Sequence, residues 1–98
     1  MKKEETIIQD KIIDYLDANK IFHIRYNAQS SKNGISDLLI CYRGYFIGAE
    51  LKTDSGTPTD LQLRKLESIR QSGGVGVIIR SLDDLLTVFK QIDLIIER

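Results

Sequence analysis

The sequence predicts an α/β domain in which helices flank one mixed central β-sheet, with the elements in the order αβββαβα. Three observations favour this class. Apolar residues recur at helical spacing near both ends of the chain. Residues 35–52 hold two apolar, β-branched runs on either side of Arg43-Gly44, and a third such run, residues 75–80, follows Gly73-Gly74. With 98 residues, of which 42% are hydrophobic, the chain suits one compact domain covering residues 1–98.

The first half of the chain begins with an amphipathic helix over residues 5–19, because Ile8, Ile12 and Leu16 recur at helical spacing. Residues 22–26 form a short apolar run that predicts a strand. Residues 27–34 are polar and predict a loop. The two strands around Arg43-Gly44 come next, and residues 53–57, which are rich in turn formers, predict a second loop.

The second half begins with a helix whose start is marked by Pro58 and Thr59 and whose end is marked by Gly73. The β-branched run at residues 75–80 predicts a buried strand. Ser81 and Asp84 are spaced as in a capping box, with Asp in place of Glu, so they predict the start of a last helix.

Composition excludes several classes of protein. The 14 basic and 14 acidic residues cancel, so no overall charge indicates a nucleic-acid or membrane partner, although local patches can still bind polyanions. Residues 1–13 are charged and contain no long apolar run, so we expect a cytoplasmic protein with no signal peptide and no membrane partner. Cys41 is the sole cysteine and lies within an expected strand, which predicts a small buried hydrophobic side chain.

The two strands around Arg43-Gly44 set up a specific register. If these two residues form the whole turn, Tyr42 lies opposite Tyr45, and counting back along both strands places Asp37 opposite Glu50. Directly opposed side chains share a face, and Lys52, two residues beyond Glu50, lies on that face too. Two alternatives stay open: a longer turn would shift the register by one and separate the carboxylates, or the three charges form a surface ion cluster without chemistry.

Each of two helices carries a polar residue at the N-terminal end of its apolar side. Glu5 is in phase with Ile8, with Gln9 one turn further along, and Gln62 is in phase with Leu66. Both residues are therefore candidates for the same site. The alternatives are that Glu5 only complements the helix dipole and that Gln62 only completes a capping box with its N-cap threonine.

The order of these motifs resembles that of a known family. Residues 36–81, SDLLICYRGYFIGAELKTDSGTPTDLQLRKLESIRQSGGVGVIIRS, resemble the VRR-NUC domain, the virus-type replication-repair nucleases of the PD-(D/E)xK superfamily, and most of all its stand-alone, phage-associated members. That family has a Gly-x-(Pro)-Asp strand, a Glu-x-Lys strand, a glycine-containing loop, a glutamine-bearing helix and Gly-Gly before the next strand. Residues 4–16 and 24–29 also resemble its first helix and its Arg-x-Asn segment. Ser36 departs from the usual proline.

The resemblance implies a restriction-endonuclease-like αβββαβ(α) core and a metal-dependent endodeoxyribonuclease that hydrolyses phosphodiester bonds, selective for branched DNA such as Holliday junctions. Its catalytic set would be Asp37, Glu50 and Lys52, supported by Gln62 and by Glu5 or Gln9. Two carboxylates and the intervening Leu51 carbonyl are hard oxygen ligands suited to Mg²⁺ or Mn²⁺. The alternative is a nuclease-fold DNA-binding or assembly module without catalysis of its own.

Further residues are candidates for contacts with partners. Sequence-independent contacts to the DNA backbone are expected from polar and cationic side chains. These are Arg25, Asn27, Lys32, Arg43, Lys65 and Arg70. Cutting both strands symmetrically calls for two active sites, so we expect a homodimer. The apolar residues Ile92, Leu94, Ile95 and Ile96 are either its interface or part of the core.

Overall fold

The computed structural model describes residues 4–26 and 38–98. Within them the elements are α1 (Glu4–Ala18), β1 (His23–Arg25), β2 (Leu38–Tyr42), β3 (Tyr45–Leu51), α2 (Asp60–Gln71), β4 (Val75–Ile79) and α3 (Leu82–Ile96). Their order is the αβββαβα order that the sequence predicts. The helix and strand ends differ from the predicted ends by a few residues at most. β1, for example, covers residues 23–25 instead of the predicted residues 22–26.

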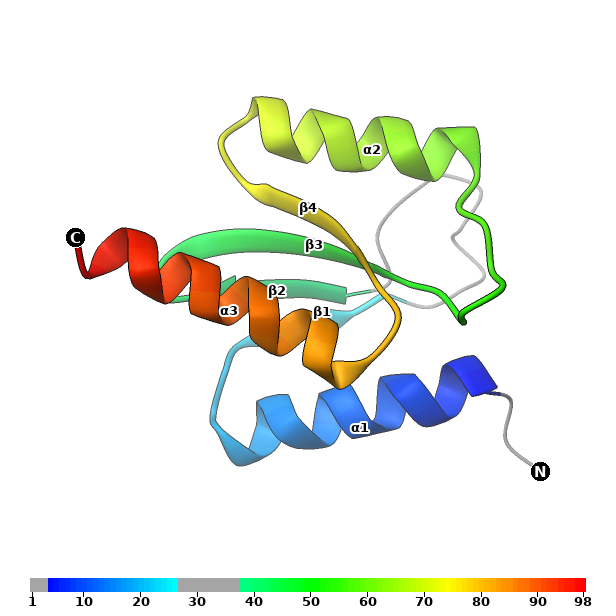
Figure 1. Ribbon diagram of the computed structural model, residues 1–98, viewed down its shortest axis with the longest axis horizontal. Helices are drawn as coiled ribbons and strands as arrows, with labels where there is room; N and C mark the ends of the chain where they lie inside the picture. The colour runs from blue at the N-terminus through cyan, green and yellow to red at the C-terminus, as the bar shows by residue number, and fades with distance from the viewer. Residues whose placement is uncertain (1–3, 27–37) are drawn as a thin grey trace.

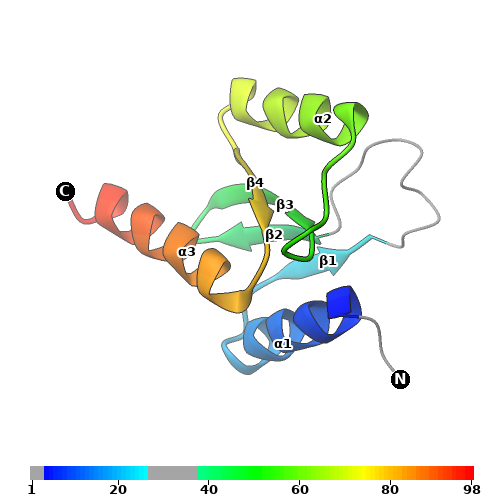
Figure 2. The same cartoon turned by 45° about the vertical axis from the view of Figure 1, so that its right-hand side comes forward.

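The four strands form one mixed sheet in the order β1-β2-β3-β4. β1 pairs with β2 and β2 with β3 in antiparallel fashion, whereas β3 and β4 are parallel. Parallel neighbours need a crossover connection, and α2 provides it. Figures 1 and 2 show this crossover: the chain leaves β3 through a loop, rises into α2 and returns into β4. The α/β class with a mixed sheet is therefore confirmed.

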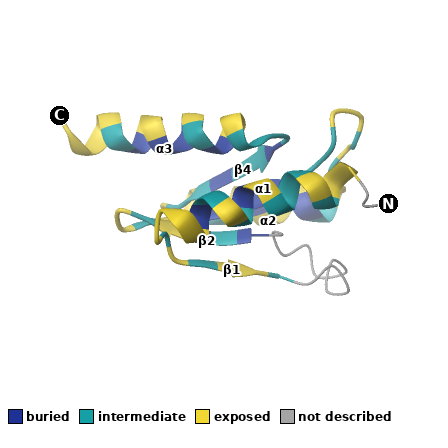
Figure 3. Ribbon diagram, turned by 90° about the horizontal axis from the view of Figure 1, so that it is seen from below, coloured by how far each residue is buried: buried dark blue, intermediate teal, exposed yellow. Residues whose placement is uncertain are grey.

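The helices cover the two faces of the sheet unequally. α2 packs on β3 and β4 from one side, while α1 and α3 contact each other and cover the opposite face (Figure 1). The core lies on the α1 and α3 side, where buried residues of α3 face the sheet and exposed residues face away (Figure 3). Across residues 4–26 and 38–98, no helix is both long enough and apolar enough to cross a membrane.

The β2–β3 hairpin has the predicted two-residue turn. Tyr42 lies opposite Tyr45, and the register continues to Leu38 opposite Ala49. The two turn residues both have positive φ, 50° for Arg43 and 88° for Gly44, the combination found in the tight turns that match the twist of paired strands. The slipped register is therefore excluded for the described part of the hairpin.

Capping at α3 is close to the prediction. Ser81 accepts a hydrogen bond from the backbone N–H of Asp84 at 3.2 Å, so it caps the helix as expected. The side chain of Asp84 accepts from the N–H of Arg80 at 2.8 Å, one residue before the position that a capping box uses. Both hydrogen bonds fix the junction between β4 and α3.

The prediction for Cys41 is wrong, because its side chain is exposed. It lies on the face of the sheet that α2 covers only over β3 and β4, so β1 and β2 present apolar side chains there. Phe22 and Phe46, on the same face, are 67% and 50% exposed. Together with Ile24 and Leu39 these residues line a shallow apolar hollow, which we call the sheet patch (Phe22, Ile24, Leu39, Cys41 and Phe46).

Candidate active site

Glu50 is the centre of the candidate site. It lies near the end of β3, the strand that pairs with β2 on one side and β4 on the other, and only 1% of its surface is exposed. Residues alternate between faces along a strand, so Glu50 shares the face of Phe46 and Gly48, which is the face beneath α2. A carboxylate in such a place is costly unless polar groups surround it.

Gln62, from the first turn of α2, supplies one of these polar groups. Its Nε2 donates a hydrogen bond of 2.7 Å to Oε1 of Glu50, and 7% of the residue is exposed. Its own Oε1 accepts from the backbone N–H of Thr59 at 2.8 Å, and Thr59 Oγ1 accepts from the Gln62 N–H at 3.1 Å. The capping box and the contact with Glu50 therefore occur together, and a part for Gln62 in a catalytic site stays a prediction.

A glycine lets α2 approach the sheet closely enough for this contact. Gly76 in β4 lies beside Gly48 in β3, and a Cβ atom at Gly76 would come within 2.4 Å of the backbone oxygen of Leu66. Leu66 is one helical turn after Gln62, so the absence of a side chain at Gly76 determines how near Gln62 comes to Glu50. Leu66 is buried, as expected from its place on the apolar side of α2, whereas Leu63 is exposed.

Lys52 comes from the first position after β3. Its Nζ lies 3.9 Å from Oε1 of Glu50, the same oxygen that Gln62 contacts, and its side chain is 19% exposed. Its backbone N–H donates to the carbonyl of Ile79 at 3.1 Å, which continues the pairing with β4 beyond Leu51. The structure thus brings together Glu50, Lys52 and Gln62, while the ammonium group keeps access to solvent.

Asp37 lies outside the described residues. Leu38, its neighbour, lies opposite Ala49, and the next pair in this register is the predicted pair of Asp37 and Glu50. The position of Asp37 opposite Glu50 therefore stays a prediction, now resting on a hairpin whose turn and register are confirmed.

The donors at this end of β3 suit a hard cation. Glu50 offers a carboxylate and Leu51 a backbone carbonyl oxygen, and oxygen ligands of this kind are preferred by Mg²⁺ and Mn²⁺. Within the described ranges no three His, Cys, Asp or Glu side chains gather as a metal-binding group. The predicted set contains only two carboxylates, of which Asp37 falls outside these ranges, so the donor chemistry fits a hydrated oxygen-ligated ion.

Glu5 is not brought to Glu50 by a described contact. It is exposed in the first turn of α1, together with Glu4, where both carboxylates complement the helix dipole. Gln9, the alternative supporting residue, is half-buried one turn further along. The support expected from α1 stays a prediction.

The candidate DNA-contacting residues are spread over the molecule. Arg25 and Lys65 are exposed, on β1 and α2, and Asn27 and Lys32 lie outside the described residues. Arg70 donates to the carbonyl of Gly76 at 2.9 Å, which ties the C-terminal end of α2 to β4. Arg43 is at the hairpin turn, the end of β3 opposite to Glu50.

Arg43 belongs to a small polar cluster at that far end. Its Nη1 donates to Oδ1 of Asp93 at 2.8 Å, and the hydroxyl of Tyr42 donates to the same oxygen at 2.9 Å. The hydrogen bond from Arg43 is the main cause that lowers the pKa of Asp93, and the bond from Tyr42 adds to it. Partial burial, followed by the bond to Asp93, raises the pKa of Tyr42. This cluster fastens α3 to the hairpin.

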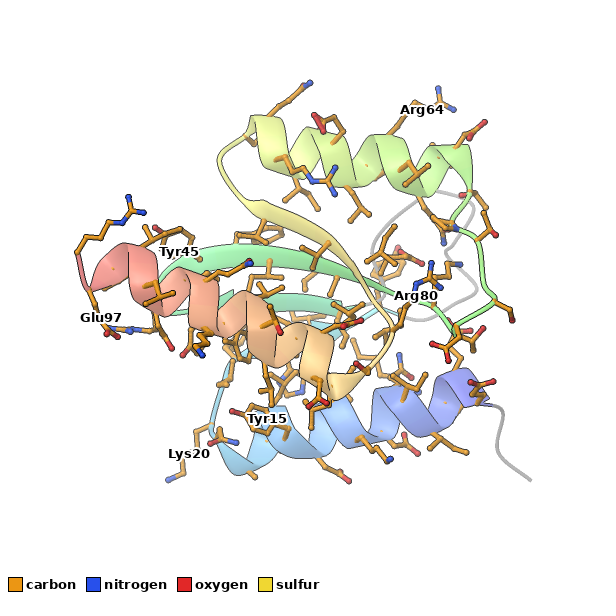
Figure 4. The ribbon with its side chains drawn as sticks, in the orientation of Figure 1. Tyr15, Lys20, Tyr45, Arg64, Arg80 and Glu97 are labelled. Carbon is orange, nitrogen blue, oxygen red and sulfur yellow. The ribbon has the colours of Figure 1, made fainter. Side chains whose placement is uncertain are left out.

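Arg80 is a residue near the site that no pattern in the sequence singles out. It follows β4, and its Nη1 donates to three carbonyl oxygens of the loop after Lys52, those of Thr53, Asp54 and Gly56. Figure 4 shows Arg80 pointing from the end of β4 toward this loop. The nearest signal in the sequence is a charged residue that ends the apolar run of β4.

Comparisons with known proteins agree with this description. No protein-family model and no curated protein sequence matches the chain. Among solved structures, one described as "VRR_NUC domain" is 25% identical, with a TM-score of 0.68, over 99% of this chain and 98% of its own. A second, "VRR_NUC domain protein", is 17% identical, with a TM-score of 0.73, over 93% of this chain and 88% of its own. The motif order and the likeness to the first structure support a VRR-NUC domain, and the mixed sheet and the likeness to both structures support the restriction-endonuclease-like fold.

Proposed function

We propose that this nuclease domain is a Mg²⁺- or Mn²⁺-dependent endodeoxyribonuclease. The observation that carries the proposal is the set of contacts at Glu50, a buried carboxylate held by the Gln62 amide at 2.7 Å and faced by the Lys52 ammonium at 3.9 Å. An ion cluster with no function would be expected at the surface, whereas this carboxylate is buried beneath α2.

Each residue has a task in phosphodiester hydrolysis. Asp37, Glu50 and the carbonyl oxygen of Leu51 would hold the ion, and the chemistry that it supplies when bound is charge stabilisation at the phosphoryl oxygens and a more acidic water. Gln62 holds Glu50 in one orientation. Lys52 offsets the charge of Glu50 and places a cation where the scissile phosphate and the attacking water would lie.

The proposed substrate is duplex or branched DNA, such as a four-way (Holliday) junction, cut by a homodimer with two active sites. The proposal of a dimer is supported by apolar side chains that remain exposed on the chain. Of the C-terminal candidates, Ile92 is part of the core, while Leu94, Ile95 and Ile96 are exposed. We favour the sheet patch as the interface, because its five side chains line a common hollow on the same face of the sheet as Glu50.

The test is cleavage of labelled linear, flap and four-way junction DNAs in the presence of Mg²⁺, Mn²⁺ or EDTA. We expect cleavage by the wild-type protein with either metal and none with EDTA. Lys52→Ala should abolish cleavage while the melting temperature and DNA binding are retained, and Lys90→Ala, which changes an exposed lysine of α3, serves as the control. Undiminished cleavage by Lys52→Ala would contradict the proposed mechanism.

A second candidate function is a DNA-binding or assembly module with this fold and no catalysis of its own. The same experiment separates the two. Metal-independent binding of junction DNA by the wild-type protein, without cleavage under any of these conditions, would favour the module.

A further inference from the structure

The loop between Lys52 and α2 is fastened by a single side chain that comes from β4. The guanidinium Nη1 of Arg80 donates to the carbonyl oxygens of Thr53, Gly56 (3.0 Å) and Asp54 (3.4 Å). Three carbonyls of one turn therefore converge on one nitrogen. A guanidinium group suits such a place, because it is always charged and presents its N–H groups in a fixed plane.

This loop also lies close to the side chain of Lys52. Gly56 donates to the carbonyl of Thr53 at 3.0 Å, which closes the turn, and a Cβ atom at Gly56 would lie 3.5 Å from Cβ of Lys52. The loop therefore folds back against the start of the Lys52 side chain. Two consecutive residues, Ile79 and Arg80, contact this segment. The carbonyl of Ile79 accepts a hydrogen bond from the N–H of Lys52, and the side chain of Arg80 donates to the turn that follows Lys52.

The other end of the loop leads to Gln62. Three residues after the turn the chain reaches Thr59, whose backbone N–H donates to the oxygen of Gln62. Arg80 thus fixes the one connection that joins Lys52 to the N-terminus of α2. Both groups that contact Oε1 of Glu50 are placed by the segment that Arg80 holds.

We propose that Arg80 is a positioning residue of the nuclease site, which sets the place of Lys52 and Gln62 through the loop at residues 53–56. The inference rests on the proposed function, in which Lys52 and Gln62 serve cleavage. A small displacement of a catalytic group lowers the rate of the chemical step more than it lowers substrate binding. Arg80 should therefore affect the rate at saturating DNA rather than the affinity for DNA.

The test compares Arg80→Ala and Arg80→Lys with Arg64→Ala and Arg64→Lys. Arg64 controls for the loss of an arginine, because it is an exposed residue of α2 that belongs neither to the candidate site nor to the candidate DNA contacts. We expect both Arg80 variants to lower the single-turnover rate at saturating DNA and Mn²⁺ by about 10- to 100-fold with little change in the dissociation constant for DNA. The Arg64 variants should retain the rate.

Rescue of Arg80→Ala by added guanidinium ion gives a further readout. Guanidinium at a concentration far below that which unfolds the protein should restore part of the rate, whereas methylammonium at the same ionic strength should not, because it lacks the planar set of donors. Loss of rate in the Arg80 and Arg64 variants alike would overturn the proposal. So would a rate unaffected by Arg80→Ala, or a loss that appears only as weaker DNA binding with a smaller salt dependence.

Amide hydrogen exchange tests the loop without using cleavage. In Arg80→Ala the N–H of Gly56 should exchange faster, while the N–H groups paired between β3 and β4 keep their protection. Unchanged exchange at Gly56 would overturn the proposal. If the wild-type protein cleaves no DNA but Gly56 loses protection in Arg80→Ala, the proposed function fails while the role of Arg80 in holding the loop stands.

Discussion

Gln62 donates a hydrogen bond of 2.7 Å to the buried carboxylate of Glu50 with one end of its amide, while the other end accepts from the backbone N–H of Thr59. The amide group is thereby held in one orientation, because each end meets a partner of the opposite kind. The Gln62 side chain thus both caps α2 and contacts Glu50. Substitutions that remove only one of these two contacts can separate their effects.

We expect Gln62→Glu to lower the cleavage rate by about 10- to 100-fold near neutral pH. The variant retains an oxygen for the Thr59 N–H but loses the donor to Glu50 and places a second carboxylate beside it, and the two like charges repel each other. Single-turnover cleavage over a range of pH measures this.

Thr59→Ala is the matched control. Loss of the Oγ1 acceptor should lower the free energy of unfolding by about 1 kcal/mol and leave the cleavage rate close to that of the wild type. Urea unfolding and the same cleavage assay check both values, and a rate loss in Thr59→Ala as large as in Gln62→Glu would show that capping alone explains the effect.

Gly76→Ala should be strongly destabilising. The new Cβ would come within 2.4 Å of the Leu66 backbone oxygen, so α2 must move away from the sheet, at a cost of about 3 kcal/mol. Cleavage should fall as well, because the movement carries Gln62 away from Glu50.

Gly44→Ala offers a comparison at the opposite end of β3. A Cβ atom there meets nothing within 4 Å, but φ is 88°, so a cost of about 1 kcal/mol from the left-handed conformation is expected, with activity retained. Urea unfolding measures the loss of stability in Gly76→Ala and in Gly44→Ala. An equal loss of stability in the two would rule out close packing of α2 on Gly76.

The cluster at the hairpin turn predicts a pH dependence of stability. Because the pKa of Asp93 is lower in the folded protein than in the unfolded chain, its stabilising contribution is fully present above the unfolded value. The contribution is lost as the pH falls through and below that value. We expect the free energy of unfolding of Asp93→Asn to decrease less steeply than that of the wild type on acidification below pH about 4. Urea unfolding at a series of pH values measures the slopes, and parallel slopes would contradict the assignment.

The proposed dimer interface is tested by Phe46→Asp. Phe46 is half-exposed at the β3 side of the sheet patch, so a carboxylate there should leave the fold intact and disfavour association through an apolar surface. Sedimentation velocity should show a dimer for the wild type and a monomer for this variant. Leu94→Asp, at a residue 59% exposed on α3, should stay dimeric. The reverse outcome would place the interface on the C-terminal helix.

The hairpin was predictable because its register depends on local chemistry alone. A two-residue turn at Arg43-Gly44 fixes every pair behind it, and the structure confirms these pairs as far as Leu38 and Ala49. The exposure of the Cys41 side chain was not predictable in the same way. Alternation tells which residues share a face, but not that α2 would stop short of β1 and β2 and leave this part of the face open.

The roles of Gln62 and Arg80 depended on distant parts of the chain. The sequence allowed Gln62 either a capping role or a place beside Glu50, and the close approach of α2 at Gly76 allows the capping contact and the contact with Glu50 together. Arg80 contacts a loop that precedes it by more than twenty residues, and no local pattern reports such a contact.

The position of Glu50 on an inner strand has a consequence for how the domain opens. β3 is paired along both edges, so its amide protons should exchange with solvent only when much of the sheet unfolds, whereas the loop after Lys52 is free to open in smaller fluctuations. Within the candidate site, Glu50 is thus fixed to the strand that should open last, whereas Lys52 adjoins a loop that can open separately. Mutations that loosen the segment can therefore change activity without changing the melting temperature.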